Sequence, residues 1–352
     1  MKQSTDFFLL EKNGIDILVK KFLEEHKVFG PTKPGHDSTF DEIKSPKELH
    51  LDYISTVLPP KKFFHPPTEN LFSFELIENT EWTYKETLHD EKTVLIGVHP
   101  CDVHAILRLD RFFSEDFRDP YYLSRRENTI IVALNCIEPS EYCFCESMGT
   151  GPFLEMGYDL LLTDIGKKYL LETGTYDGKK LLDGLKLEKA DKKDLYEKKK
   201  LLEQAKKKFK RHVNTDGLSA LLDDDTHDWD IWTKLAENGY PGKSFPCLSC
   251  GSCSLVCPTC YCYDVYDVID LSLKKGVRKR ELDSCQLLEY AEVALGGNFR
   301  RDRRERIRHW LMCKFGMAAG GDKSGCVGCG RCIRICPSKI DITEVARIIR
   351  GE

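Results

Sequence analysis

The sequence predicts an α/β domain at the N-terminal end, followed by a mainly α-helical domain that is rich in cysteine. In the first half of the chain, continuous apolar runs typical of buried strands alternate with helical patterns, which favours a parallel sheet. Twelve of the 16 cysteines lie after residue 246, and the segments between them have helix-like apolar spacing. With 352 residues, the chain is long enough for two or three domains.

The first elements of the α/β domain are a short helix and two buried strands. Apolar spacing predicts a helix around Ile15–Glu25, and the Pro-rich segment 31–67 argues against long regular elements there. The apolar run Thr93–Val98 predicts the first clear strand, and Asp102 is a candidate N-cap for the helix after it. Thr129–Cys136 is the second predicted strand, so this order resembles a βαβ unit.

Two further strands and a Lys-rich helix follow. Asp159–Leu162 and Lys168–Glu172 flank a Gly-containing turn and are predicted strands. Residues 187–213 carry apolar residues on one side and are predicted to form an amphipathic helix, and the segment DWDIWTKL predicts a second, short one. The Lys run is interpreted as a solvated face, with docking of an acidic partner as the alternative.

Composition and charge exclude several classes of function. Lys and Arg number 53 against 57 Asp and Glu, so the net charge of -4 gives no reason to expect a nucleic-acid surface. No apolar run approaches the length of a membrane span, and acidic residues appear too early for a signal peptide. The chain is therefore expected to be cytoplasmic, where clustered cysteines favour metal or cluster ligation over disulfides.

Two stretches of the sequence repeat the pattern C-x2-C-x2-C-x3-C followed by proline. Bacterial ferredoxins hold cubane [4Fe-4S] clusters with this pattern, whereas a zinc site is expected to have CxxC pairs separated by a loop. Gly251, Gly328 and Gly330 are expected to let backbone amides approach the sulfides. In two-cluster proteins the fourth cysteine of each run ligates the other cluster. The predicted ligands are Cys247, Cys250, Cys253 and Cys336 for the first cluster, and Cys326, Cys329, Cys332 and Cys257 for the second.

The cross-ligation requires the two motifs to meet although 68 residues separate Cys257 from Cys326. The segments YDVYDVIDLSLKKG, ELDSCQLLEYAEVALGG and RDRRERIRHWLMCKFGM between them are predicted helices, where a compact ferredoxin has a β-hairpin. The predicted fold class is therefore an α/β N-terminal domain followed by a mainly α-helical ferredoxin-type domain with two [4Fe-4S] clusters. Its predicted divisions are residues 1–185 (α/β domain), 186–240 (helical linker region) and 241–352 (helical dicluster ferredoxin domain).

Eight cysteines lie outside these two motifs, in two groups. Those of the α/β domain follow or lie near the carboxyl ends of predicted neighbouring strands, which open onto one crevice in a parallel sheet. They are interpreted as a third cluster site, with independent buried thiols, zinc or a redox-active thiol pair as alternatives. The second group gives a fourth cluster site, or thiols that pack beside the first cube. The first group is Cys101, Cys136, Cys143 and Cys145, and the second is Cys260, Cys262, Cys285 and Cys313. His99, His104 and His309 are less favoured ligands.

Several blocks, in order, carry a resemblance to a known family. They include GVHPCDVHAI, NCIEPSEYCFC, CLSCGSCSLVCPTCYCYDVYD, RELDSCQ and CVGCGRCIRICPSKIDI. Together they resemble the beta subunit of soluble cytoplasmic [NiFe] hydrogenases, also called sulfhydrogenases, and the A subunit of anaerobic sulfite reductase. The resemblance implies an electron-transfer subunit with [4Fe-4S] clusters, partnered by a flavin subunit that handles NAD(P)H or is linked to ferredoxin and by a separate catalytic subunit. Because the blocks include the cysteines of the α/β domain, the resemblance also favours the third cluster.

The predicted function is an electron conduit rather than a catalytic subunit. No G-x-G-x-x-G follows a strand and no G-x-x-x-x-G-K-[ST] loop occurs, so hydride chemistry is expected elsewhere. Arg331 and Arg334, inside the second motif, are hypothesised to raise its potential relative to the first motif, with surface exposure of both arginines as the alternative. The alternative is a thiol-based polysulfide or disulfide reductase, in which Arg125, Arg126 and His104 activate α/β thiols or instead pair with nearby acids. A zinc-containing structural or nucleic-acid module is a third class, which the near-neutral charge opposes.

Overall fold

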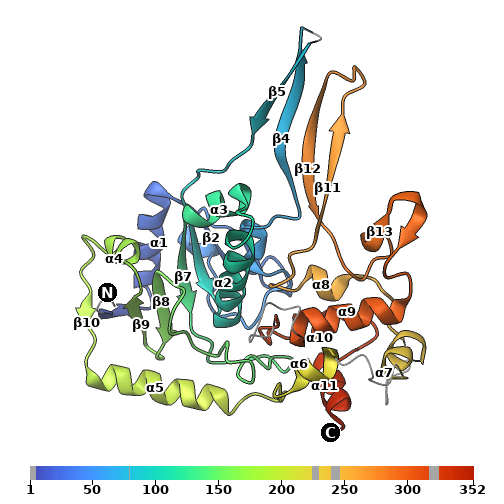
Figure 1. Ribbon diagram of the computed structural model, residues 1–352. Helices are drawn as coiled ribbons and strands as arrows, with labels where there is room; N and C mark the ends of the chain where they lie inside the picture. Colours follow the sequence, from blue (N-terminus) through green and yellow to red (C-terminus); the bar gives the residue numbers. More distant parts are fainter. Residues whose placement is uncertain (1–4, 79, 224–229, 239–245, 317–324) are drawn as a thin grey trace.

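The computed structural model describes residues 5–78, 80–223, 230–238, 246–316 and 325–352 of the chain. The N-terminal half is built on one eight-stranded mixed sheet (Figure 1). In spatial order, its strands are β10 (Glu188–Lys189), β1 (Phe7–Glu11), β9 (Lys168–Thr173), β8 (Leu160–Asp164), β7 (Thr129–Leu134), β6 (Thr93–Val98), β2 (Lys27–Thr32) and β3 (Thr39–Glu42).

The centre of this sheet is parallel, as the buried apolar runs predict. Strand β6 pairs in parallel with both β2 and β7, and β7 pairs in parallel with β8. Leu95 lies opposite Ile131, and both side chains are fully buried. The α/β prediction is therefore confirmed, and the predicted strands at 159–162 and 168–172 form a hairpin, β8 and β9. Strand β1, which the sequence analysis missed, pairs with β9.

Helices lie against the sheet and along its edge (Figure 1). The helix predicted at Ile15–Glu25 is present, and the predicted Lys-rich helix is shorter than 187–213. Asp102 is not the N-cap of the helix after β6, because the cap is His99 and Asp102 lies in the first turn. These helices are α1 (Gly14–Glu25), α2 (Pro100–Ser114), α3 (Pro120–Glu127), α4 (Tyr176–Lys180) and α5 (Lys192–Lys206), with 3-10 turns η1 (Pro46–Glu48) and η2 (Pro60–Phe63).

Two β-hairpins pack side by side into a second, four-stranded antiparallel sheet that projects from the body as an arm (Figure 1). The arm consists of β4 (Thr68–Ile77), β5 (Glu81–Glu86), β11 (Tyr263–Ile269) and β12 (Lys275–Leu282). The helix predicted from YDVYDVIDLSLKKG is therefore wrong. The spacing of its aspartates imitates a helical period, but its Tyr, Val and Ile residues favour strands, and β12 gains a partner in β4.

The base of the arm is fixed to the body by buried ion pairs. Glu69 of β4 is 3% exposed at its side chain and contacts Arg125 at 2.6 Å and Arg280 at 2.7 Å. Arg280 also binds Asp119, the residue that caps α3. Arg125 thus pairs with an acidic residue. Such pairing was the alternative to its proposed role in activating thiols.

The cysteine-rich part is smaller and only partly helical. Of its predicted helices, RDRRERIRHWLMCKFGM forms α9, whereas ELDSCQLLEYAEVALGG forms short turns and a small hairpin. The elements of the chain beyond residue 217 that complete the described structure are α6 (Leu218–Asp223), α7 (Asp230–Thr233), η3 (Lys234–Asn238), α8 (Ser252–Leu255), η4 (Glu289–Ala291), β13 (Glu292–Val293), η5 (Ala294–Gly296), β14 (Gly297–Asn298), α9 (Arg303–Phe315), α10 (Arg331–Ile335) and α11 (Ile342–Arg350).

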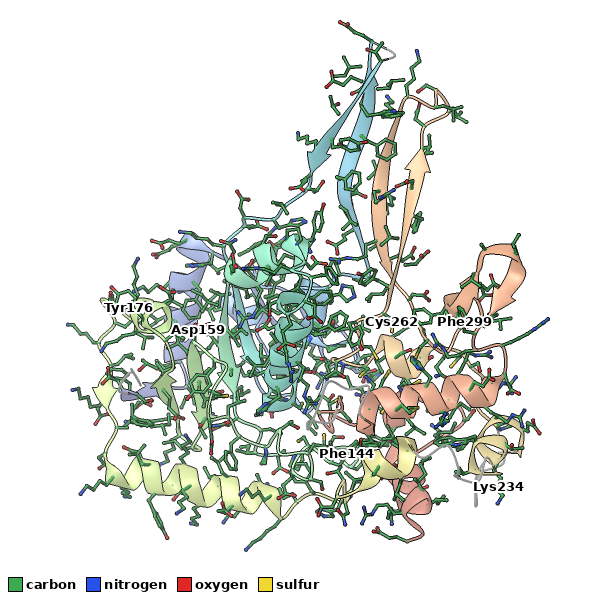
Figure 2. The ribbon with its side chains drawn as sticks, viewed as in Figure 1. Phe144, Asp159, Tyr176, Lys234, Cys262 and Phe299 are labelled. Atoms are coloured by element: carbon green, nitrogen blue, oxygen red, sulfur yellow. The ribbon has the colours of Figure 1, made fainter. Side chains whose placement is uncertain are left out.

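A second hydrophobic core lies among these helices and includes a residue of the α/β part. Trp310, Leu311 and Val345 are buried there together with Phe144 (Figure 2). The predicted boundary at 240/241 lies outside the described residues, and the domain division stays a prediction. Within the described part of the chain, no helix combines the length and apolar character that crossing a membrane requires.

Candidate iron–sulfur sites

The two cysteine motifs have the same local backbone conformation. Ser249 and its counterpart Gly328 have φ angles of 51° and 63°, and Gly251 and its counterpart Gly330 have φ angles of 75° and 73°. Gly251 and Gly330 are the N-caps of α8 and α10, so each motif turns from a loop into a short helix at the same cysteine spacing. The repeat seen in the sequence is therefore also a structural repeat.

This backbone directs an amide group of each motif at a cysteine sulfur. The N–H of Ser249 donates to Sγ of Cys247 at 3.4 Å, and the N–H of Gly328 donates to Sγ of Cys326 at 3.3 Å. Hydrogen bonds to sulfur favour the thiolate and, in a cluster, stabilise negative charge. The two motifs therefore provide equivalent donors.

The first predicted ligand set surrounds one cavity. The cavity has a volume of about 570 Å³, and apolar residues such as Ile307, Trp310 and Leu311 form much of its wall. Cys336 lines it although that residue belongs to the second motif, whereas Cys257 of the first motif is not in its wall. Its four predicted thiols are Cys247, Cys250, Cys253 and Cys336.

The second predicted ligand set surrounds a neighbouring cavity of about 330 Å³. Here Cys257 and Cys253 of the first motif line the cavity together with three cysteines of the second motif. Phe144, Trp310 and Ile342 form apolar walls, and Lys314 supplies a buried cation. Its four predicted thiols are Cys326, Cys329, Cys332 and Cys257.

The four cysteines of the α/β part line a third cavity, of about 370 Å³. Cys101 lies in the first turn of α2 after β6, and Cys136 follows β7, so the parallel pair β6 and β7 brings them to one edge of the sheet. The loop after β7 supplies Cys143 and Cys145. His99 also lines this cavity, whereas His104 and His309 line none of the three.

The loop that carries Cys143 and Cys145 lies directly on the second motif. The N–H of Phe144 donates to the carbonyl of Gly328 at 2.8 Å, and the hydroxyl of Thr150 donates to the carbonyl of Val327 at 2.7 Å. A Cβ added to Gly328 would lie 2.6 Å from Cα and N of Cys145. Only glycine permits this close approach of the two backbones.

The three cavities form a row because they share walls. Cys253 and Cys332 line both the first and the second cavity, and Cys329 lines both the second and the third. The second cavity therefore lies between the other two. Cys250 of the first cavity is solvent-exposed, so that end of the row opens toward the surface.

Apart from the exposed Cys250, these thiols are buried or partly buried, and burial opposes ionisation. Burial raises the pKa of Cys326 to about 11, and it raises those of Cys329 and Cys136 to about 12. Bound iron would supply the positive charge that displaces these protons. The first two cavities thus combine their predicted thiols with a largely apolar wall, whereas the third combines them with the buried Asp102 and Arg331, and all three donor sets fit thiolate ligation of a [4Fe-4S] cluster.

A single metal ion makes a different geometric demand. Zinc needs its sulfur ligands at about 2.3 Å from one centre. Among the residues that the structure describes, no three His, Cys, Asp or Glu side chains are arranged to hold one ion.

The last group of cysteines lies at the base of the arm, where Figure 2 shows Cys262. Cys260 hydrogen bonds with Cys257, a predicted ligand of the second cluster. A hydrogen bond with Cys285 lowers the pKa of Cys262 to about 6, although burial opposes this. Sγ of Cys313 lies 3.7 Å from Nε2 of His309. Thiols in this group therefore contact each other or a neighbouring side chain.

Charged residues that the sequence analysis missed or misjudged border these sites. Lys314 is 4% exposed, and its ammonium donates to the hydroxyl of Thr259 at 3.2 Å. Burial acts against its charge, but the neighbouring Cys257 and Cys260 thiolates raise the pKa of Lys314 well above its usual value. In the sequence, Lys314 directly follows Cys313 and belongs to a segment whose neighbouring positions face inward. This position was the signal that Lys314 is buried. Arg126, offered as a thiol activator, pairs instead with Asp110.

The fold and sites define an iron–sulfur protein with a dicluster domain. Residues 246–340 match the family model described as a 4Fe-4S dicluster domain. The chain is also 38% identical over 331 residues to sulfhydrogenase 2 subunit beta of Pyrococcus furiosus, an alignment that covers 93% of each chain. The chain belongs to this sulfhydrogenase beta-subunit family of iron–sulfur electron-transfer proteins. No solved structure matches it.

Proposed function

We propose that this chain relays electrons through three [4Fe-4S] clusters inside a hydrogenase-type complex. The observation that supports the proposal is the row of three cavities, each lined by the four thiols of one predicted set together with one cysteine of a neighbouring set. A row of neighbouring redox centres suits one-electron steps over a distance. The order along the row is first site, second site, third site.

In this proposal the chain's own residues hold and tune the clusters. The twelve cysteines of the three cavities are the ligands, in the sets given above. Backbone amides such as those of Ser249 and Gly328 donate to ligand sulfurs, and apolar walls keep water away. Lys314 offsets negative charge beside the second site. When bound, each cluster supplies reversible one-electron redox chemistry.

The partners are the second part of the proposal. The relative in Pyrococcus is named as one subunit of a sulfhydrogenase, which supports assembly with a hydrogenase catalytic subunit. We further propose a flavin-containing partner that handles NAD(P)H or ferredoxin electrons. The exposed Cys250 and the neighbouring Leu248, 56% exposed, support the first site as one transfer end.

Two other functions use parts of the same site. An A-type subunit of anaerobic sulfite reductase would use the same row with a different catalytic partner. A thiol-based polysulfide or disulfide reductase needs a low-pKa thiol in the α/β part, whereas burial raises the pKa values of Cys101, Cys136 and Cys145. This disfavours catalysis by these thiols.

The test is the content of iron and acid-labile sulfide per chain, on protein purified without oxygen. About twelve of each are expected from three clusters. A Cys145→Ser variant is expected to lose one paramagnetic signal of the reduced protein and keep the other two. The matched control, Cys313→Ser, is expected to keep all three.

The other outcomes separate the alternatives. About eight iron atoms per chain would remove the third site, and about sixteen would add a fourth cluster, held by the Cys260 group. Zinc without sulfide would overturn the electron-transfer proposal. Which subunits co-purify with the chain when the complex is expressed in full decides between a hydrogenase and a sulfite reductase.

A further inference from the structure

One buried ion pair lies where the second and third sites meet. Arg331 is in the second motif between Cys329 and Cys332, and Asp102 directly follows Cys101 of the third site. Their side chains are 4% and 2% exposed and form two parallel hydrogen bonds, of 2.6 Å and 2.8 Å. Both residues line the third cavity, and so does Cys329 from the second site.

Arg331 also fixes a wall of the third cavity. Its Nε donates to the carbonyl of Thr56 at 2.9 Å, and its Nη2 donates to the Thr56 hydroxyl at 3.1 Å. Ile54 and Ser55, which precede Thr56, line the cavity. The guanidinium is therefore held by four hydrogen bonds and has one orientation relative to both sites.

The two ends of the pair act unequally on the two sites. At the second site, Arg331 belongs to the cysteine motif itself and lies between the predicted ligands Cys329 and Cys332, whereas Asp102 belongs to α2. At the third site both ends of the pair line the cavity, so their opposite charges oppose each other there. The pair thus presents net positive character to the second site and a balanced field to the third.

We propose that the buried Arg331–Asp102 pair raises the reduction potential of the second site relative to the third, so that an electron at the third site moves toward the second. The inference rests on the proposed function, because it requires a cluster at both sites. Positive character near a cluster favours its reduced form, which carries one more negative charge, and charge and hydrogen bonding are among the factors that set cluster potentials. No bond forms or breaks, and one electron leaves the third cluster and enters the second.

The test is a redox titration of each signal, with the third-site signal assigned by its loss in Cys145→Ser. In the double variant Arg331→Gln/Asp102→Asn, both charges disappear while two amides can still hydrogen bond. We expect the second-site potential to fall and the third-site potential to move less. The control is Arg334→Gln, which removes the same charge from the same motif at a side chain that is 37% exposed and paired with Asp37. It is expected to move neither potential.

The single variant Asp102→Asn keeps the proposal testable if the double variant folds poorly. It leaves the Arg331 charge uncompensated, so the second-site potential is expected to rise, which is opposite in sign to the double variant. A general loosening of the structure would not shift the second-site potential in opposite directions in the two variants. Equal shifts at both sites, or none, in a protein with about twelve iron atoms would overturn the inference alone. About eight iron atoms in the unaltered protein would instead show that the third-cluster proposal had failed, and this inference with it.

Discussion

Replacing Gly328 with alanine tests whether the close contact between the α/β loop and the second motif holds the third site together. Gly328 has φ of 63°, and an alanine in this left-handed region costs about 1–2 kcal/mol. The new Cβ would also meet Cα and N of Cys145 at 2.6 Å and the carbonyl carbon of Phe144 at 2.7 Å. These are backbone atoms that cannot turn away, so overpacking adds about 1–3 kcal/mol. The expected loss of stability is about 2–5 kcal/mol.

Gly149 provides a matched control within the same loop. Its φ is 64°, but a Cβ there would meet nothing within 4 Å. Gly149→Ala therefore carries the backbone cost alone, about 1–2 kcal/mol. The difference between the variants isolates the steric contact of Gly328 with the Cys145 loop.

The assay is thermal unfolding without oxygen, together with iron content. Gly328→Ala is expected to unfold at a lower temperature than Gly149→Ala, by about 2–4 °C for each kcal/mol of difference. It is also expected to hold about eight iron atoms where Gly149→Ala holds about twelve, because the displaced loop carries third-site thiols. Equal midpoints and equal iron in the two variants would refute the reasoning that backbone packing on the motif builds the third site.

Three further changes test other parts of the structure. Glu69→Gln removes the carboxylate that Arg125 and Arg280 share at the base of the arm, while Arg280 keeps Asp119, and it should cost about 3–5 kcal/mol with faster hydrogen exchange in the arm strands. The exposed ion-pair variant Asp267→Asn should leave the stability nearly unchanged. Burial and nearby cations lower the pKa of His65 to about 3, so the unfolded state alone gains a proton below about pH 6.5; stability should fall toward pH 3 by up to about 1.4 kcal/mol per pH unit, and His65→Phe should remove that component from the measured pH profile. Cys336→Ser should alter the first-site paramagnetic signal and Cys257→Ser the second-site signal, and the reverse pattern would contradict the exchanged ligand sets.

The sequence was most informative where a local pattern determines local geometry. The four thiols of each ligand set predicted from the cysteine spacing line one cavity, but Cys332 also lines the first cavity and Cys253 the second, so the exchange of Cys257 and Cys336 stays a prediction. The apolar runs predicted the buried strands β6 and β7, and the ends of these strands brought Cys101 and Cys136 together as expected for a parallel sheet.

It was least informative where the deciding contact is distant in the chain. YDVYDVIDLSLKKG contains β11, which pairs with β12, and β12 in turn pairs with β4, which precedes it by roughly 200 residues; no local pattern reveals that partner. Arg331 forms its ion pair with Asp102 across 229 positions. Its spacing inside a cysteine motif suggested an electrostatic role, but its burial and its partner depend on how the two parts of the chain pack.

The location of the third site explains why the α/β part and the cysteine-rich part of the chain pack against each other. The first and second cavities are lined by residues of the cysteine-rich part, apart from Phe144, which joins the wall of the second. The third cavity needs Cys101 and Cys136 from the sheet and Cys329 and Arg331 from the second motif. Its ion pair is buried, and a buried charge without its partner is strongly unfavourable. The same packing that completes the third site therefore also satisfies Arg331, so the row of sites can extend into the α/β part only when the two parts are docked.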